Sequence, residues 1–232
     1  MSSSISLPMI RTMLSLQSTM NTEVNPNWIT AEYPFLRAAM IEGAEAMDHL
    51  GWKWWKKQEE NIPQYKIELI DIWHFALSAV LVENNGDIEE TGKEIIAKLS
   101  STYQREGISF GSVFHQFDKL DTLDRIQLLI GLASANHFSY PLFETLMVDV
   151  RMGWEEFFKQ FVGKNTLNLL RQANGYKEGN YIKMWNGKED NVYLEEVMEL
   201  IDCASPTFAD DLYRTLSDVY AQVYAPKDIV HG

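Results

Sequence analysis

The sequence of 232 residues predicts an all-α fold, with residues 1–232 forming a single helical domain. Apolar residues recur at helical spacing in most segments, whereas the alternation typical of strands is hard to find. No Pro/Gly/Ser-rich linker or low-complexity tract divides the chain. Because 46% of the residues are hydrophobic, with seven Trp, eleven Phe and ten Tyr, the chain has ample material for an ordered core.

Proline and capping residues indicate where the first three helices begin. Ser6 can cap a first helix whose apolar positions run from Met9 to Met20. A second helix is expected from about Tyr33 to Leu50, with a proline in its first turn. Pro63 opens a third, which is apolar on most sides and ends at Asn84-Asn85-Gly86.

Helices are also expected through most of the remaining chain, at residues 88–99, 119–138, 141–162, 164–173, 192–203 and 208–223. The exception is Asn174 to Asn191, where three glycines and polar residues surround aromatic ones. This composition indicates an ordered loop with a short turn or strand. The stretch after about Leu194 carries no motif to which we can give a role.

Charge and cysteine content limit the possible functions. A net charge of −13 argues against binding nucleic acid or anionic membranes, because both need a basic surface. It allows a nucleotide substrate, since a bound metal ion can bridge an acidic cluster to phosphates. The single cysteine, Cys203, excludes an intrachain disulfide and fits a cytoplasmic or other reducing intracellular compartment. We expect no signal peptide in residues 1–16 and no stretch with the ~18 apolar residues of a membrane span.

Two acidic pairs, Glu42-x-x-Glu45 and Glu68-x-x-Asp71, fall within expected helices. Carboxylates three residues apart share a helix face, so two adjacent helices can gather four acids around hard cations. The first pair alone is typical of a solvated face. The second lies among large apolar residues with no Lys or Arg from 69 to 92, which favours a metal as partner over a distant base.

The ligand set favours magnesium or manganese over a di-iron centre. A ferritin-like site needs a Glu-x-x-His element on each of two helices, and Asp71-x-x-His74 is the nearest approach. His74 alone is more typical of a packing residue than of a ligand.

Two further segments suit a nucleotide. In Trp52-Lys-Trp-Trp-Lys56, three tryptophans cannot all face one core from a helix, so one is expected to be exposed or to line a cavity. Farther on, Lys164, Asn168 and Arg171 share a helix face before a glycine-containing loop, as in a phosphate clamp. The alternative for the tryptophans is core packing, and the alternative for the basic segment is an ordinary surface helix and loop. The basic segment contains no phosphate-loop fingerprint.

In combination, these motifs resemble the dimeric all-α dUTPases, which are related to the MazG-type nucleotide pyrophosphatases. The resemblance runs from about Gln17 to Asn191 and implies the all-α NTP pyrophosphatase fold and a homodimer. It implies that Glu42, Glu45, Glu68 and Asp71 hold Mg²⁺, with Mn²⁺ as a possible substitute. Glu42 would act as general base toward a water that attacks phosphorus, so that dUTP gives dUMP and pyrophosphate.

The resemblance also assigns residues to the rest of the substrate. Gln17 and Asn21, with Trp54, would recognise uracil, while His74 and Phe75 would lie against the sugar and Phe75 would disfavour a ribose 2′-hydroxyl. The remaining sugar and phosphate contacts would come from Lys164, Asn168, Arg171, Tyr176, Lys177 and Tyr181. Hydrolysis of dUDP is expected as well. The alternatives are a related pyrophosphatase that prefers another base, as in dCTP, and a helical interaction protein whose tryptophans bind a partner.

Overall fold

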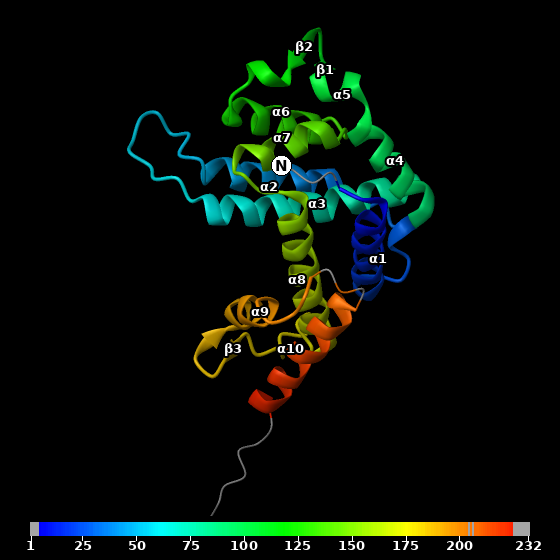
Figure 1. Cartoon of the computed structure of the whole chain (residues 1–232), viewed down its shortest axis with the longest axis vertical. Coiled ribbons are helices and arrows are strands. Elements are labelled where there is room, and N and C mark those ends of the chain that lie inside the picture. The colour runs from blue at the N-terminus through cyan, green and yellow to red at the C-terminus, as the bar shows by residue number, and fades with distance from the viewer. Residues whose placement is uncertain (1–4, 204, 206, 225–232) are drawn as a thin grey trace, which may run out of the picture. The chain divides into compact units, whose positions relative to one another are not determined.

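The structure is a computed structural model that describes residues 5–203, 205 and 207–224. These residues form ten α-helices and two small two-stranded hairpins, so the predicted all-α fold is confirmed (Figure 1). The chain divides into two compact units, residues 1–158 and 159–232, which are described separately. The single domain expected from the sequence stays a prediction.

The first unit contains most of the helices. In chain order its elements are α1 (Leu7–Val24), the 3-10 turn η1 (Trp28–Thr30), α2 (Phe35–Asp48), α3 (Ile62–Glu83), α4 (Ile88–Ser100), α5 (Thr102–Glu106), β1 (Gly107–Phe110), β2 (Val113–Gln116), the 3-10 turn η2 (Phe117–Lys119), α6 (Thr122–Ser134) and α7 (Tyr140–Asp149). Helices α2 and α3 pack side by side, α6 covers α2, and α1 packs on α3 and α4 (Figure 1). Strands β1 and β2 pair in antiparallel register.

Local chemistry explains where these helices begin. The Ser6 hydroxyl accepts a hydrogen bond from the Met9 amide at 3.4 Å, as the sequence predicts for a cap. Asn61 caps α3 through the Gln64 amide at 3.3 Å, with Pro63 in the first turn. The start of α3 is therefore specified locally.

Helix α3 is central to the core of the first unit. Trp73 on α3 is fully buried, stacks on Phe143 at 5.0 Å, and meets Trp154 and Phe157 edge to face. A large ring enclosed by aromatic neighbours cannot rotate without opening a cavity. This packing fixes the face of α3 that carries Glu68 and Asp71.

Gly43 lets α2 approach α6 closely. A Cβ atom at this position would lie 2.8 Å from Cγ1 of Ile130, closer than two carbon atoms pack. Since Gly43 lies next to Glu42, the same contact sets the rotation of α2 about its axis. The glycine thus helps to direct Glu42 toward α3.

The second unit begins within a long helix, α8 (Trp154–Ala173), which starts in the first unit. The elements that follow are β3 (Met184–Trp185), β4 (Lys188–Glu189), α9 (Asp190–Met198) and α10 (Phe208–Tyr224). Tyr220 of α10 stacks on Tyr181 at 5.0 Å and lies 5.4 Å from the buried ring of Trp185. Among the described residues, no helix combines the length and apolar character that a membrane span needs.

The structure corrects the expected helix boundaries around α8. We expected one helix to end near residue 162, but the break lies at residues 150–153, where Arg151 has a φ of +55°. Helix α8 then continues through Gly163, and Met198 occupies the space where a Cβ would be. That glycine serves packing and does not end the helix. The β1–β2 hairpin was not predicted, and α9 ends at Met198 rather than at residue 203.

Candidate active site

Three carboxylates from α2 and α3 converge. One oxygen atom each from Glu42, Glu68 and Asp71 lies within 4.8 Å of the other two. Glu68 is buried, and the other two are half-buried. Three of the four acids that the sequence singles out therefore meet in one group.

Such a cluster requires positive charge nearby. Carboxylates at this separation repel one another, and partial burial weakens the screening by water. On the α2 side, His49 Nε2 lies 3.5 Å from Glu68 Oε1. Sequence reasoning missed His49, although it follows Glu42 by seven residues, two helical turns, and so shares its face.

The fourth acid, Glu45, is exposed and lies outside this group. One turn farther on, Asp48 holds the loop of residues 49–61 in place. It accepts a hydrogen bond from Trp52 Nε1 at 2.9 Å and pairs with Lys53. Hydrogen bonds from Lys53 and then Trp52 hold the pKa of the Asp48 carboxyl below its usual range.

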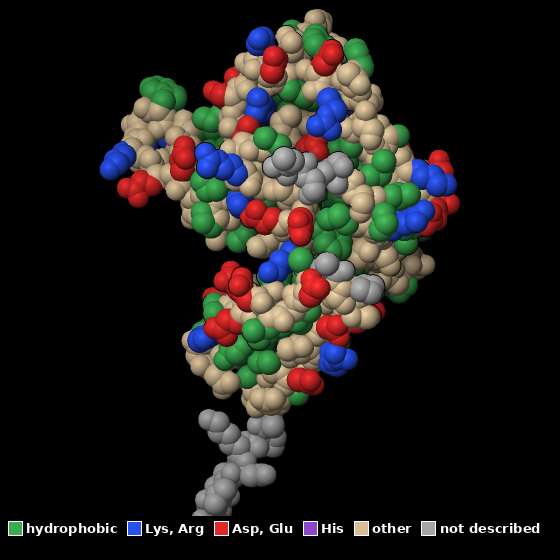
Figure 2. Space-filling view, in the orientation of Figure 1, with side chains coloured by type: hydrophobic (Ala, Val, Ile, Leu, Met, Phe, Trp, Pro, Cys, Tyr) green, Lys and Arg blue, Asp and Glu red, His purple; other side chains and the backbone are tan. Residues whose placement is uncertain are grey.

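The three tryptophans of this loop pack on one another. Trp55 meets the rings of Trp52 at 5.1 Å and Trp54 at 5.5 Å, both edge to face. Trp54 is 89% exposed, as the sequence predicts for at least one of the three. Figure 2 shows hydrophobic side chains at the tip of the projecting loop, at the left of the view.

A polar network joins α1 to the far part of α3. Gln17 Nε2 contacts Asn21 Oδ1 and Ser78 Oγ, both at 3.0 Å, and Asn21 Nδ2 donates to Ser78 Oγ at 2.9 Å. His74 Nδ1 lies 2.6 Å from Gln17 Oε1. The structure thus brings three predicted residues together around Ser78, which sequence reasoning missed.

The carboxylates and this network lie on the same face of α3. Asp71, His74 and Ser78 follow one another at spacings of three and four residues. Seven residues from Asp71 to Ser78 correspond to about 10 Å along the helix. Phe75, one turn after Asp71, is half-buried between them.

Trp54 is not brought to this network. Its loop precedes α3, and sixteen residues from Ile62 to Ser78 correspond to about 24 Å of helix. Figure 1 shows the loop at one end of the α2–α3 pair and α1 at the other. In this conformation, Trp54 therefore lies far from Gln17 and Asn21.

In the second unit, three of the predicted residues, Asn168, Arg171 and Tyr181, form a network with Asp190, the first residue of α9. Arg171 donates to both carboxylate oxygens, from Nε at 2.8 Å and from Nη2 at 2.9 Å, and the Tyr181 hydroxyl donates at 2.8 Å. Asp190 has 0% exposure. Burial alone would raise the pKa of Asp190, but the hydrogen bonds from Arg171 and Tyr181 hold it below the usual value.

Arg171 is largely committed to this network. Besides its bonds to Asp190, it donates from Nη1 to Asn168 Oδ1 at 3.1 Å and from Nη2 to Asn191 Oδ1 at 3.4 Å. These bonds use four of the five guanidinium N–H groups. The ring of Tyr176 lies 6.0 Å from the guanidinium carbon. Sequence reasoning missed Asp190, which lies 19 residues after Arg171 in a segment expected to be a loop.

The loop that follows α8 leaves the helix through a tight turn. Gly175 has a φ of +80°, the Tyr176 amide donates to the Arg171 carbonyl at 3.0 Å, and the Gly175 amide donates to Gln172 at 3.2 Å. This is the Schellman arrangement, which favours glycine at the left-handed position. Lys164 is half-buried on α8, and Lys177 is exposed in the loop.

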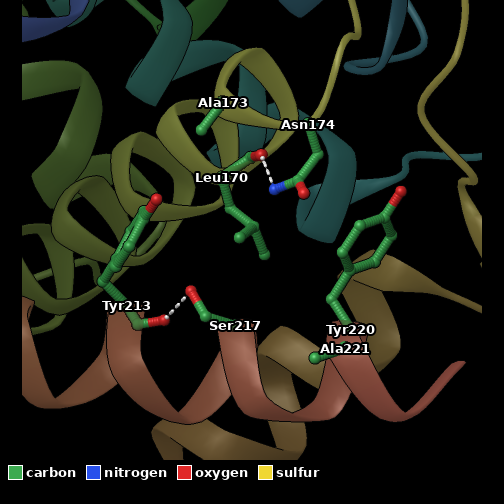
Figure 3. Close-up of a pocket in the computed structure, with 7 residues that line it drawn as sticks. All are labelled: Leu170, Ala173, Asn174, Tyr213, Ser217, Tyr220 and Ala221. Carbon is green, nitrogen blue, oxygen red and sulfur yellow. Dashed lines mark hydrogen bonds between the residues drawn. The ribbon is translucent and has the colours of Figure 1, made fainter. Parts of the chain in front are cut away.

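A cavity of about 580 Å³ lies between α8 and α10 (Figure 3). Its lining contains no charged side chain and consists of Leu170, Ala173, Asn174, Tyr213, Ser217, Tyr220 and Ala221. Asn174 Nδ2 donates to the Leu170 carbonyl, and Ser217 Oγ donates to the Tyr213 carbonyl (Figure 3). A neutral lining does not suit a triphosphate, so the carboxylate cluster is the better candidate for a nucleotide site.

The helical fold and the carboxylate cluster define an all-α protein with an acidic site between two packed helices. Residues 9–176 match the sequence model of the dUTPase family, and the chain belongs to this all-α dUTPase family. A search of curated proteins finds no match. Family membership makes the protein a dUTP diphosphatase that acts on deoxyuridine nucleotides, and enzymes of this family generally use a divalent metal ion. The match ends at Tyr176, before α9 and α10.

Proposed function

We propose that this enzyme hydrolyses dUTP, and also dUDP, in a Mg²⁺-dependent reaction at the carboxylate cluster. The observation that supports the proposal is the convergence of oxygen atoms from Glu42, Glu68 and Asp71 within 4.8 Å. A set of carboxylate oxygens suits Mg²⁺, with Mn²⁺ as a substitute. When bound, such an ion would neutralise phosphate charge and lower the pKa of coordinated water.

The roles within the cluster follow from chemistry and from the family pattern. Glu42, Glu68 and Asp71 would hold the metal, and Glu45 would join them by turning its exposed side chain inward. Glu42 would accept the proton of the water that attacks phosphorus, and the bond to the leaving pyrophosphate then breaks. No covalent intermediate is needed, because water is the nucleophile.

The base and sugar would extend along α3 from the carboxylates. Phe75 and His74 lie about one turn after Asp71 on α3, where the deoxyribose is expected. Gln17 and Asn21 would contact uracil, and Trp54 would stack on it only after the loop of residues 49–61 changes conformation. From the family pattern, Lys164, Asn168, Arg171, Tyr176, Lys177 and Tyr181 are proposed to complete the sugar and phosphate contacts. The same pattern supports a homodimer.

Product analysis tests the reaction and its substrate preference. The purified protein is incubated with Mg²⁺ and separately with dUTP, dUDP, dCTP, dTTP and UTP, and the products are resolved by anion-exchange chromatography. We expect dUMP from dUTP and from dUDP, little conversion of dCTP and UTP, and no turnover in EDTA. Faster hydrolysis of dCTP would contradict the base assignment, and full activity in EDTA would contradict the metal assignment.

A further inference from the structure

Ser78 is at the centre of the polar network between α1 and α3, and its hydroxyl has a single proton. The residue has 0% exposure, and Oγ donates to the His74 carbonyl at 2.9 Å. With that proton committed, Oγ can only accept hydrogen bonds from its other neighbours. Whichever amide atoms contact Ser78 must therefore be nitrogens.

This constraint fixes the orientation of two side-chain amides. Gln17 Nε2 lies 3.0 Å and Asn21 Nδ2 lies 2.9 Å from Ser78 Oγ. Gln17 Oε1 is then directed at His74 Nδ1, at 2.6 Å, so this ring nitrogen must carry the proton. One hydroxyl thus sets two amide orientations and one imidazole tautomer.

The hydrogen bonds leave Asn21 with one free donor and one free acceptor in fixed positions. Gln17 is 5% exposed, and its two N–H groups serve Ser78 and Asn21 Oδ1. Asn21 is half-buried and uses one N–H and one lone pair within the network. It retains one N–H on Nδ2 and one lone pair on Oδ1. These point in different directions, because Ser78 and Gln17, 3.0 Å apart, occupy the edge on which the amide donor and acceptor lie side by side.

We propose that Ser78 is a positioning residue that sets the pyrimidine preference of this enzyme by holding the Asn21 amide in one orientation. The inference rests on the proposed contact between Asn21 and the base. In this orientation, Oδ1 can accept a hydrogen bond from N3–H of uracil, or Nδ2 can donate one to its C4 carbonyl. In the same pose, cytosine presents a lone pair at N3 and an amino group at C4, so that acceptor meets acceptor or donor meets donor. Cytosine would need the amide turned by half a rotation, which Ser78 and Gln17 prevent.

The test compares substrate preference in Ser78→Ala and in the wild-type enzyme. Without the Ser78 acceptor, the Asn21 amide can rotate and accept either base. In the wild-type enzyme, a fixed polar group that faces the wrong donor or acceptor penalises the wrong base strongly. The free amide of Ser78→Ala no longer imposes this penalty. We therefore expect the ratio of kcat/KM for dUTP to that for dCTP to fall about tenfold or more, mainly through KM. A folded Ser78→Ala enzyme with an unchanged ratio would overturn the proposal.

Two further variants separate positioning from simple destabilisation. Ser78→Cys is close in size but has a weak acceptor, so it should lower the ratio as alanine does, and it replaces Ser78→Ala if that variant fails to fold. In an Asn21→Ala background, Ser78→Ala should change the ratio no further, since Ser78 acts through Asn21. An additional loss there would show that Ser78 does not act through the amide.

Ser217→Ala is the matched control. Its hydroxyl also donates to a carbonyl four residues earlier, Tyr213 O at 2.7 Å, but it belongs to the α8–α10 cavity and not to this network. The ratio should be unchanged in this variant, and an equal fall would remove the case for Ser78.

If the wild-type enzyme prefers dCTP, the base assignment itself fails. If it prefers dUTP and the ratio in Ser78→Ala is unchanged, only this inference fails.

Discussion

Glu68 gives a prediction at the scale of single residues, because its proposed role in activity and its effect on folding oppose each other. It is the buried member of three clustered carboxylates, with His49 Nε2 at 3.5 Å. We expect Glu68→Gln to lower kcat/KM for dUTP more than a hundredfold, because even residues that only support a metal ligand cost about 10–100-fold. Stability in EDTA should stay within about 1 kcal/mol of wild type, because the substitution relieves repulsion.

The matched control for this prediction is Glu83→Gln, an exposed acid at the end of the same helix. Its activity should equal that of wild type when both are measured by pyrophosphate release from dUTP. Full activity of Glu68→Gln, with a native circular dichroism spectrum, would remove Glu68 from the metal site.

Asp190 gives a residue-scale prediction about pH. Its pKa lies below the usual value of about 3.9, so the ionised form stabilises the fold above about pH 4. That contribution is lost as the pH falls through the folded-state pKa. Asp190→Asn leaves Arg171 without its charged partner and should cost about 3 kcal/mol at pH 7, at the lower end of values for broken buried pairs because Arg171 is partly exposed.

The measurement is the thermal midpoint of wild type and Asp190→Asn across a pH series. The difference in thermal midpoint between the two proteins should be constant from pH 5 to 7 and should narrow below about pH 4. A difference that stays the same at low pH would show that the charge of the Asp190 carboxylate does not hold Arg171 in place. Asn168→Ala, which removes a neutral partner of the same guanidinium, should lower the thermal midpoint by less and without this pH dependence.

At the scale of elements, α10 supports the loop that carries Tyr176 and Tyr181. Tyr220 stacks on Tyr181, and its hydroxyl accepts a hydrogen bond from the Ile182 amide at 3.2 Å. Tyr220→Phe should destabilise the protein by about 1 kcal/mol through the lost hydrogen bond. Tyr220→Ala should cost about 3–5 kcal/mol through the lost ring. Urea unfolding measures both, and equal effects of the two variants would contradict the packing role of the ring.

At the same scale, the sequence predicts features that depend on neighbouring residues and misses those that depend on distant ones. The cap at Ser6, the proline in the first turn of α3 and the spacing of Glu68 and Asp71 are local features, so the sequence predicts these helices and their acids. Ser78 was missed because its amide partners lie 61 and 57 residues away. The packing role of Gly163 was missed for the same reason, since its contact, Met198, belongs to α9.

At the scale of the whole molecule, the net charge of −13 and the local cluster make different predictions for added cations. Figure 2 shows Asp and Glu side chains spread over the visible face, where monovalent salt screens them. Sodium chloride should therefore change the thermal midpoint gradually. A metal site that forms only in the folded state should instead respond to Mg²⁺ by mass action and saturate.

Thermal unfolding with MgCl₂ and with NaCl at equal ionic strength separates these effects. At a Mg²⁺ concentration one hundred times the dissociation constant, stability should rise by about 2.7 kcal/mol, which corresponds to roughly 5–10 °C for a chain of this size. Glu68→Gln and Asp71→Asn should lose most of the Mg²⁺-specific shift, while Glu83→Gln should keep it. Equal shifts from both salts, or an intact shift in Asp71→Asn, would mean that diffuse surface charge explains the response. The carboxylates of α2 and α3 would then need another partner than a metal ion.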